Sequence, residues 1–371
     1  MDFSFSSDQQ LLKNSARAFL DEHVKPALVR SLIDDPRGES EALWKEMAQL
    51  GWLGLSLPEE HGGSGLGMVE TAILLEEMGR AALPAPYLPT ILAARAIAEA
   101  GTPEQQQRWL PAIATGSARA TIAFLDNDLS WDLSTATATR AVGAPDRWRL
   151  SGAKRFVPWA HVADVILVPA RSQKGLSLFF VDPSTAGITM SPAPLMDVAG
   201  RWSTLALDQV SVTEMLGPSG QVGALLNSVV LCGAVGAAAG MLGAARRCLD
   251  MAVSYAKVRE QFGQPIGSFQ AIRHKCAEML LEVENSHAAT YYAAWALDAK
   301  SEDHAVAASV AKAYVGDAAR KVCSEAIQVH GGIGFTWEYD LHLYFKHAKA
   351  LEAMYGDGDH HRELIVRQVA G

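Results

Sequence analysis

Residues 255–270 read Tyr-Ala-Lys-Val-Arg-Glu-Gln-Phe-Gly-Gln-Pro-Ile-Gly-Ser-Phe-Gln, and the rest of the expected fold is arranged around them. The stretch ends a long apolar helix, turns at Gly263 and Pro265, and soon starts a second helix. Lys257 and Arg259 would lie in the last helical turn, where cations oppose the helix dipole and bind free carbonyl groups. The stretch therefore predicts two helices joined by a tight turn.

Arg259 begins a run of chemically distinct groups. Its planar guanidinium can form two parallel hydrogen bonds with a phosphate. Gln261 adds an amide, Phe262 an aromatic surface and Gly263 a backbone that no side chain shields. These are the groups needed to hold a pyrophosphate and the adenosine joined to it. The alternative is that Arg259 only neutralises the end of the helix.

Three segments together resemble one known family, the acyl-CoA dehydrogenases, which are FAD-dependent flavoproteins. Residues 259–270 resemble the family's arginine segment, and residues 328–336 (Gln-Val-His-Gly-Gly-Ile-Gly-Phe-Thr) resemble its second dinucleotide-binding segment. Residues 57–66 (Leu-Pro-Glu-Glu-His-Gly-Gly-Ser-Gly-Leu) resemble its N-terminal signature. The segments follow the family's order and spacing, so the resemblance covers nearly the whole chain.

The residue patterns and the resemblance imply an α+β fold of three domains. Residues 1–118 are expected to form an N-terminal helical domain, and residues 119–216 a small antiparallel β-barrel or sandwich. Residues 217–371 are expected to form an antiparallel four-helix bundle. This order of helices, strands and a helical bundle is the one that the resemblance implies.

Local patterns predict where the elements begin and end. Two capping boxes mark helix starts in the first domain, Ser7 with Gln10 and Thr102 with Gln105. Apolar residues at a period of two predict strands at residues 148–150, 165–168, 176–181 and 205–212. Turn residues at 263–265, 301–303 and 331–334 divide the last domain into four helical segments.

Composition and spacing exclude several functions. The formal net charge of -9 leaves no basic face for a nucleic acid. Four cysteines without a Cys-x-x-Cys pair predict neither a zinc site nor disulfides, which indicates a reducing, cytoplasmic location. His360 and His361 are too close together for both rings to bind one metal, so no metal is expected. The uncharged run 222–245 is rich in glycine and alanine, which favours a buried helix over a membrane span.

The resemblance implies a defined chemistry. A carboxylate takes the proton next to a thioester as general base, and the flavin ring accepts a hydride from the next carbon. A base, a ring pocket and anchors for the adenosine diphosphate end of FAD are therefore required. The residues that match the family's anchors are Arg259, Gln261, Phe262, Gln270, Gln328, Gly331 and Gly332. The two glycines could equally form only a helix cap and a turn.

The ring pocket departs from the family. Members usually carry Thr-Glu-Pro-Gly-x-Gly-Ser-Asp, whereas residues 125–132 read Leu-Asp-Asn-Asp-Leu-Ser-Trp-Asp, and only Ser130 and Asp132 match. The usual aromatic-Ile-Thr-Asn is Phe-Val-Pro-Trp at residues 156–159. Pro158 has neither a hydroxyl nor a backbone N–H to offer the flavin.

The base is missing at its usual position. The family's frequent Ile-Tyr-Glu-Gly-Thr appears as Met-Tyr-Gly-Asp-Gly at residues 354–358, with Gly356 in place of the glutamate. A minority of members place the base on the long helix before the arginine segment, where this chain has Gly233. Asp357 and Asp359 are nearby candidates, but each is shorter and displaced, and a solvated or capping role is favoured for both.

Anchors without a ring pocket or base indicate a composite enzyme. In the family, FAD lies across a subunit interface and the neighbouring chain supplies the anchors. The chain also resembles bacterial members that break down steroids and lipids as heterotetramers. The resemblance thus implies a subunit that completes the FAD site of a catalytic paralogous partner, with an acyl-CoA thioester as substrate. An electron-transfer flavoprotein is the candidate electron acceptor.

Two alternatives remain open. One is a self-sufficient homo-oligomeric dehydrogenase that uses Asp357 or Asp359 as a relocated base. The other is a scaffold that binds acyl-CoA or partner proteins without redox chemistry. Arg259 and the Gly331–Gly332 pair argue against the scaffold, because a scaffold has no use for phosphate anchors.

Overall fold

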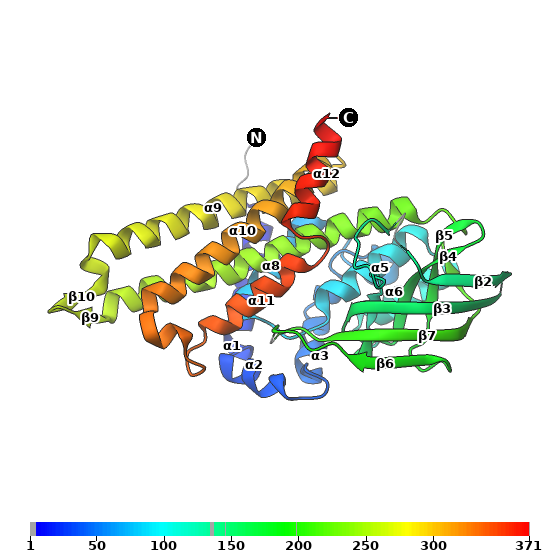
Figure 1. Cartoon of the computed structure of the whole chain (residues 1–371), viewed down its shortest axis with the longest axis horizontal. Coiled ribbons are helices and arrows are strands. Elements are labelled where there is room, and N and C mark those ends of the chain that lie inside the picture. Colours follow the sequence, from blue (N-terminus) through cyan, green and yellow to red (C-terminus); the bar gives the residue numbers. More distant parts are fainter. Residues whose placement is uncertain (1–4, 134–136, 145, 198, 371) are drawn as a thin grey trace.

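The computed structural model describes residues 5–133, 137–144, 146–197 and 199–370. Figure 1 shows an elongated molecule with the C-terminal helices at one end and a β-sheet at the other. The N-terminal helices lie between these two ends, and the long helix α8 (Gly223–Val258) extends from the tip of the C-terminal helices towards the sheet. This is the acyl-CoA dehydrogenase-like α+β arrangement that the sequence predicts.

The N-terminal helices are α1 Ser7–His23, α2 Pro26–Ile33, α3 Glu41–Gln49, α4 Met68–Ala81, α5 Tyr87–Ala100 and α6 Pro103–Ala114. The predicted capping box of Thr102 and Gln105 starts α6. The capping box predicted at Ser7 is wrong by one residue. Ser6 holds the extended conformation of an N-cap and accepts the Gln9 N–H, whereas Ser7 is already helical.

Eight strands form one sheet: β1 Ala120–Ile122, β2 Arg140–Ala144, β3 Arg147–Pro158, β4 Val165–Ser172, β5 Gly175–Val181, β6 Ile188–Pro192, β7 Trp202–Val212 and β8 Met215–Leu216. Its order is β6-β7-β3-β2-β4-β5-β8, with β1 parallel to β4. The four predicted strands lie within β3, β4, β5 and β7. Along β4, Ile166 and Val168 enter a core inside the sheet, whereas Val165 and Leu167 pack in the core shared with the helices.

The C-terminal helices are α8, α9 Gln270–Ala299, α10 His304–His330, α11 Leu341–Ala353 and α12 Gly358–Ala370. A two-stranded hairpin, β9 Glu260–Gln261 and β10 Gln264–Pro265, joins α8 to α9. The last of the four predicted helical segments is divided, because Tyr355 and Gly356 have φ of 57° and 93° and end the helix between α11 and α12. Short 3-10 turns occur at Trp52–Gly54, Glu59–His61, Ala160–Val162, Ile266–Ser268 and Gly331–Phe335.

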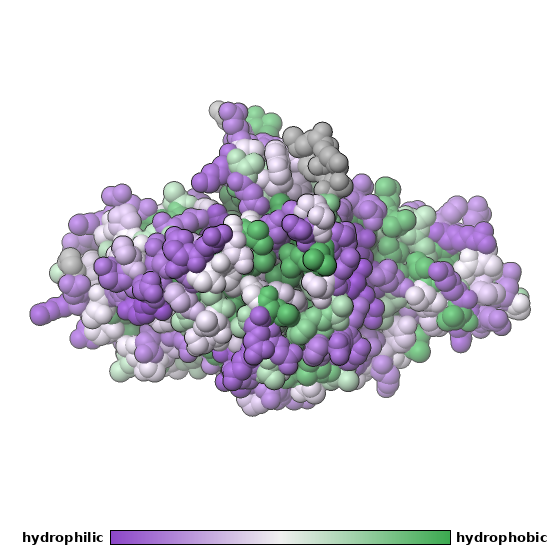
Figure 2. Space-filling view, turned by 180° about the vertical axis from the view of Figure 1, so that it is seen from behind, coloured by the Kyte–Doolittle hydropathy of each residue, from purple (hydrophilic) through white to green (hydrophobic). Residues whose placement is uncertain are grey.

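Helix α8 is the longest helix and packs against α4, α5, α9, α10 and α11. By length and composition it could cross a membrane, but 78% of its apolar window is buried inside the protein. Small residues allow this burial: a Cβ at Gly243 would stand 1.8 Å from the backbone oxygen of Glu76 on α4. The helix is therefore apolar because other helices surround it. Figure 2 shows that polar and charged residues cover most of one face of the molecule, with apolar residues gathered near its middle.

Candidate functional site

An open groove lies at the tip of the helical bundle, where α8 and α9 meet the end of α10. Its volume is about 680 Å³. It is lined by Arg259, Gln261 and Phe262 from the hairpin and by Gly331 and Gly332 from the turn after α10. Two segments that resemble dinucleotide-binding motifs, about seventy residues apart in the chain, thus form one surface. Gln270 and Gln328 are exposed next to it but do not line it.

The hairpin presents an aromatic ring to solvent. Its two turn residues, Phe262 and Gly263, have φ of 54° and 78°, the conformation of a tight two-residue turn. A bulky side chain rarely takes this conformation, yet the side chain of Phe262 is 93% exposed and touches only the edge of Phe269, 6.1 Å away between ring centres. The backbone is therefore strained to hold an uncovered ring, which is suited to stacking on a planar ligand.

The remaining groove residues offer charge and close backbone approach. Within the described ranges the guanidinium of Arg259 has neither an ion-pair partner nor a hydrogen bond, although its backbone carbonyl accepts the Ile266 N–H at 2.7 Å. Gly331 has φ of 66°, and a Cβ on Gly331 or Gly332 would meet no atom within 4 Å. The Gly331 N–H caps α10 through the Gln328 and Ile327 carbonyls, and the space beside both glycines lets a ligand approach the backbone closely.

The floor of the groove is aromatic, a feature that the sequence analysis missed. The rings of Tyr255 and His330 stack 4.4 Å apart, and His330 Nε2 lies 3.0 Å from the Tyr339 hydroxyl. Burial lowers the pKa of His330, so the ring is neutral near pH 7. The stacking of Tyr255 on His330 follows from no short motif, because the two residues lie on different helices.

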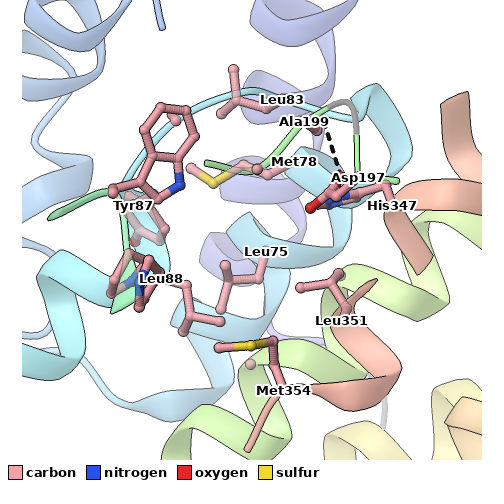
Figure 3. A pocket seen from close by; sticks show the side chains of 18 of the residues that line it. Leu75, Met78, Leu83, Tyr87, Leu88, Asp197, Ala199, His347, Leu351 and Met354 are labelled. Carbon is pink, nitrogen blue, oxygen red and sulfur yellow. Dashed lines mark hydrogen bonds and ion pairs between the residues drawn. The ribbon is translucent and has the colours of Figure 1, made fainter. Parts of the chain in front are cut away.

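A second cavity, of about 80 Å³ and less open than the groove, lies between α4, α5, α8, α11 and the sheet (Figure 3). Pro158 and Trp159, from the expected ring pocket, line it together with Met354 and Tyr355. Figure 3 shows mostly apolar side chains pointing into it, among them Leu75, Met78, Leu88, Leu351 and Met354. The cavity is smaller than the roughly 300–1,000 Å³ of small-molecule sites.

One polar pair faces this cavity. His347 Nδ1 on α11 lies 3.2 Å from Asp197 Oδ1, and the same oxygen accepts the Ala199 N–H at 3.0 Å (Figure 3). The sequence analysis did not find this pair, because 150 residues separate its members. Asp197 is the one carboxylate among the described residues that line the cavity.

Three aromatic rings lie beside the cavity, where the family's ring-binding segments map. The rings of Trp131 and Tyr355 are 5.7 Å apart, and that of Phe124 lies 5.8 Å from Trp131 and 6.1 Å from Tyr355. Tyr355 packs so closely on α8 that a Cβ at Gly233 would stand 2.5 Å from its ring. The cluster fills the space between the segment 125–132 and α8 with side chains of this chain.

The loop that carries Gly356 is fixed by buried groups. Lys312 on α10 donates to the carbonyls of Glu352 and Gly356, both at 2.7 Å. His361 Nε2 lies 2.8 Å from the Tyr355 carbonyl. Burial lowers the pKa of Lys312 to about 7 and that of His361 to about 4. A Cβ at Gly356 would stand 2.4 Å from the His360 ring, so the loop is built around a glycine.

The two carboxylates named as candidate bases point elsewhere. Asp357 Oδ1 accepts the His360 N–H at 2.9 Å, which caps the start of α12. Asp359 pairs with Arg362 at 3.0 Å on the surface. Neither residue lines the cavity. In the described part of the chain, no group of three His, Cys, Asp or Glu side chains is placed to hold a metal ion.

The fold and the groove define a flavoprotein dehydrogenase of the acyl-CoA class. Models of the N-terminal, middle and C-terminal domains of acyl-CoA dehydrogenase match residues 6–117, 126–210 and 227–370. This chain belongs to the acyl-CoA dehydrogenase family, whose members are FAD-binding oxidoreductases that act on CH–CH bonds.

The chain is similar along nearly its whole length to other acyl-CoA dehydrogenases, one of which is named for steroids. The chain is 31% identical over 352 residues to acyl-CoA dehydrogenase IpdE2 of Mycolicibacterium smegmatis, with 95% of each chain covered. It matches the structure of a Tcur3481-Tcur3483 steroid acyl-CoA dehydrogenase variant with a TM-score of 0.90 and 34% identity over 98% of both chains. It also matches the ChsE4-ChsE5 complex from Mycobacterium tuberculosis, with a TM-score of 0.90 and 28% identity over 100% of this chain and 99% of that one. These likenesses support the resemblance to the heteromeric steroid branch.

Proposed function

We propose that this chain is the subunit that completes the FAD site of a catalytic paralogous partner in a heterotetrameric acyl-CoA dehydrogenase. The complex would carry out the α,β-dehydrogenation of an acyl-CoA thioester. One observation carries the proposal: in the described part of the chain the Arg259 guanidinium of the open groove has no partner, whereas the one carboxylate that lines the smaller cavity, Asp197, is paired with His347.

The residues present fit one end of FAD. In the groove, Arg259 can fork onto the pyrophosphate, the backbone at Gly331 and Gly332 can approach it, and Phe262 can stack on the adenine. The flavin ring, when bound, accepts the hydride. The described residues offer no matching site for that ring, because Pro158 lacks the N–H and hydroxyl of the family pattern and the rings of Trp131 and Tyr355 pack in the adjoining space.

The site residues therefore have unequal roles. Arg259, Gln261, Phe262, Gly331 and Gly332 bind the shared FAD, and Gln270 and Gln328 flank them. The partner supplies the base and the ring pocket. One similar structure is named for a steroid acyl-CoA dehydrogenase and another is a two-component complex, and these support a bulky lipid or steroid acyl-CoA as substrate. The proposal also includes a cytoplasmic location and an electron-transfer flavoprotein as electron acceptor.

The rival functions have weaker support. A relocated base would have to reach the substrate, but Asp357 caps a helix and Asp359 is held in a surface ion pair. A scaffold without redox chemistry would not need a strained, exposed Phe262 beside an unpaired arginine. Both rivals predict behaviour of the purified chain that differs from that of a composite enzyme.

Flavin content tests the proposal. The chain purified alone is expected to be colourless, with less than about one flavin per ten chains, because half of each FAD site is missing. The candidate partner is a family member encoded by a neighbouring gene, whose protein keeps the catalytic glutamate and the ring pocket. The two chains produced together are expected to form a yellow complex with acyl-CoA-dependent reduction of an artificial acceptor. About one flavin per subunit in the lone chain would contradict the proposal and favour a homo-oligomer.

A further inference from the structure

A small cationic pocket lies away from both the groove and the cavity, between the first helices and the α8–α11 pair. Its volume is about 270 Å³, and it shares no lining residue with either of them. It is lined by Asp21, Val24, Lys25, Pro26, Arg80, Ala81, Arg247 and Tyr344. Three cations face one carboxylate, so the described lining carries an excess of two positive charges.

Arg247 is the central donor of this pocket. Its guanidinium is half-buried, hydrogen-bonds to the Tyr344 hydroxyl and lies 5.9 Å from the centre of that ring. No carboxylate lies within 4.0 Å of it in the described part of the chain. The next acid along the helix, Asp250, lines a different groove, between α8 and α9. Burial opposes the charge of Arg247, but the nearby Tyr344 and Asp21 raise its pKa overall. Because neither of them forms an ion pair with the guanidinium, its N–H donors can accept an external anion as a partner.

The preceding residue shows that α8 can pair its arginines. Arg246 lies 3.2 Å from Glu76 and 3.3 Å from Glu284 on the other side of the helix. The two arginines are neighbours with similar exposure, and they differ in whether the chain supplies an acid. This makes Arg246 a matched control for Arg247.

Arg80 adds a second set of donors. One of its terminal nitrogens donates to Asp21 Oδ1 at 2.7 Å. Its Nε is buried and has no hydrogen-bond partner among the described residues, and the side chain is 11% exposed. Lys25 donates to the backbone carbonyl of Asp21. The Asp21 carboxylate is thus paired with Arg80, while further N–H donors of both arginines remain.

We propose that this pocket binds a phosphate group, either as free phosphate or as the terminal phosphate of an organic ligand. Forked N–H donors from two arginines match the oxygens of a tetrahedral oxyanion. Its volume lies below the roughly 300 Å³ at which sites for whole small molecules begin, so only the anionic group enters. The inference does not depend on the composite enzyme.

Calorimetric titration of the full chain with inorganic phosphate, at constant ionic strength with chloride as the reference anion, tests the site. We expect saturable binding with a Kd below about 1 mM. Arg247→Gln is expected to weaken it about tenfold or more, because one charge-assisted contact is lost. Arg246→Gln is expected to leave the Kd within about twofold, since that side chain faces Glu76 and Glu284.

Two further arms separate the sources of phosphate and guard against misfolding. If coenzyme A binds more tightly than inorganic phosphate, and its analogue without the 3′-phosphate loses this extra affinity, the ligand is an organic phosphate. If only inorganic phosphate binds, the ligand is the free anion. Tyr344→Phe keeps the packing and is expected to weaken binding several-fold. The proposal is overturned by no saturable binding up to about 20 mM, by equal losses in Arg246→Gln and Arg247→Gln, or by phosphate binding that disappears when the partner subunit is present.

Discussion

The groove at the tip of the bundle and the cavity beside Gly356 differ in which direction their side chains face. In the groove, Phe262 is almost fully exposed beside Phe269, and the Arg259 guanidinium has no partner among the described residues. At the cavity, Tyr355 and Trp131 pack against one another, and Tyr355 packs against α8. One region is unfinished without another molecule, whereas the other is filled by its own residues. This difference is the basis of the proposal that the chain keeps the half of a dinucleotide site that serves a neighbour.

The difference has a physical basis in what each region needs. Phosphate anchoring needs only an arginine and backbone that a ligand can approach, and neither disturbs the core. A ring pocket needs a void in the interior, and a void that no ligand fills costs packing energy. Once a partner supplies the ring site, side chains such as Trp131 can occupy that space at a gain in stability. The aromatic cluster is therefore the expected result of losing the ring.

The largest effect is expected in the groove. Arg259→Lys replaces a fork by a point charge, so the assembled complex should bind FAD about 10- to 100-fold more weakly, which corresponds to roughly 1.5–3 kcal/mol. Flavin release measured by fluorescence during dilution gives the affinity. Arg367→Lys, on the exposed α12, is the matched control and should have no effect. Unchanged flavin affinity would mean that Arg259 only neutralises the end of α8.

The next effect concerns the loop that carries Gly356, beside the second cavity. Gly356→Glu restores the family's residue type but requires φ near 93° and places Cβ against His360. We expect the free energy of unfolding to fall by roughly 1–3 kcal/mol, with no dehydrogenase activity gained by the lone chain. Gly358→Glu, two residues on, should stay within about 0.5 kcal/mol of the wild type. A stable Gly356→Glu chain that binds flavin and turns over acyl-CoA would show that the cavity is still an active site.

Much of the fold follows from local sequence signals, but the inner site does not. The Thr102 cap starts α6 as expected. The sequence analysis missed β1, β2, β6 and β8, which are short or lie near sheet edges, where the period of two is hardest to recognise. Those strands gain their conformation from pairing with distant neighbours.

The candidate site was predictable to the extent that motifs are contiguous. Arg259 and Gly331 lie in segments with recognisable spacing, so their meeting in one groove could be expected from the resemblance. By contrast, Lys312 meets the Gly356 carbonyl across 44 residues. No periodicity reveals that contact, because a buried lysine on α10 has the same sequence signature as an exposed one. The stacking of Tyr255 on His330 was hidden for the same reason.

A smaller effect should appear in the pH dependence of stability. The pKa of Lys312 in the folded chain is about 7, below its ordinary 10.5, so the unfolded chain binds more protons between these values and the free energy of unfolding rises with pH. In Lys312→Met the rise from pH 7 to pH 9 should be smaller by roughly 1–3 kcal/mol, measured by urea unfolding. Lys349→Met removes an exposed lysine and should keep the wild-type slope. If the free energy of unfolding changes equally with pH in the wild type and in Lys312→Met, water reaches Lys312 and its pKa is not lowered by burial.

The smallest effect is expected at Asp357, the carboxylate next to the missing glutamate. If it were the base, Asp357→Asn would remove the proton acceptor and lower turnover about 100-fold or more. Its oxygen instead caps α12 through the His360 N–H, and asparagine caps a helix about as well as aspartate. Turnover of the complex should therefore stay within about threefold, the range of an ordinary surface substitution. Steady-state dehydrogenation with an artificial acceptor, at equal flavin content, measures this. A hundredfold fall would make this chain its own catalyst, because a helix cap alone cannot account for lost proton abstraction while the flavin remains bound.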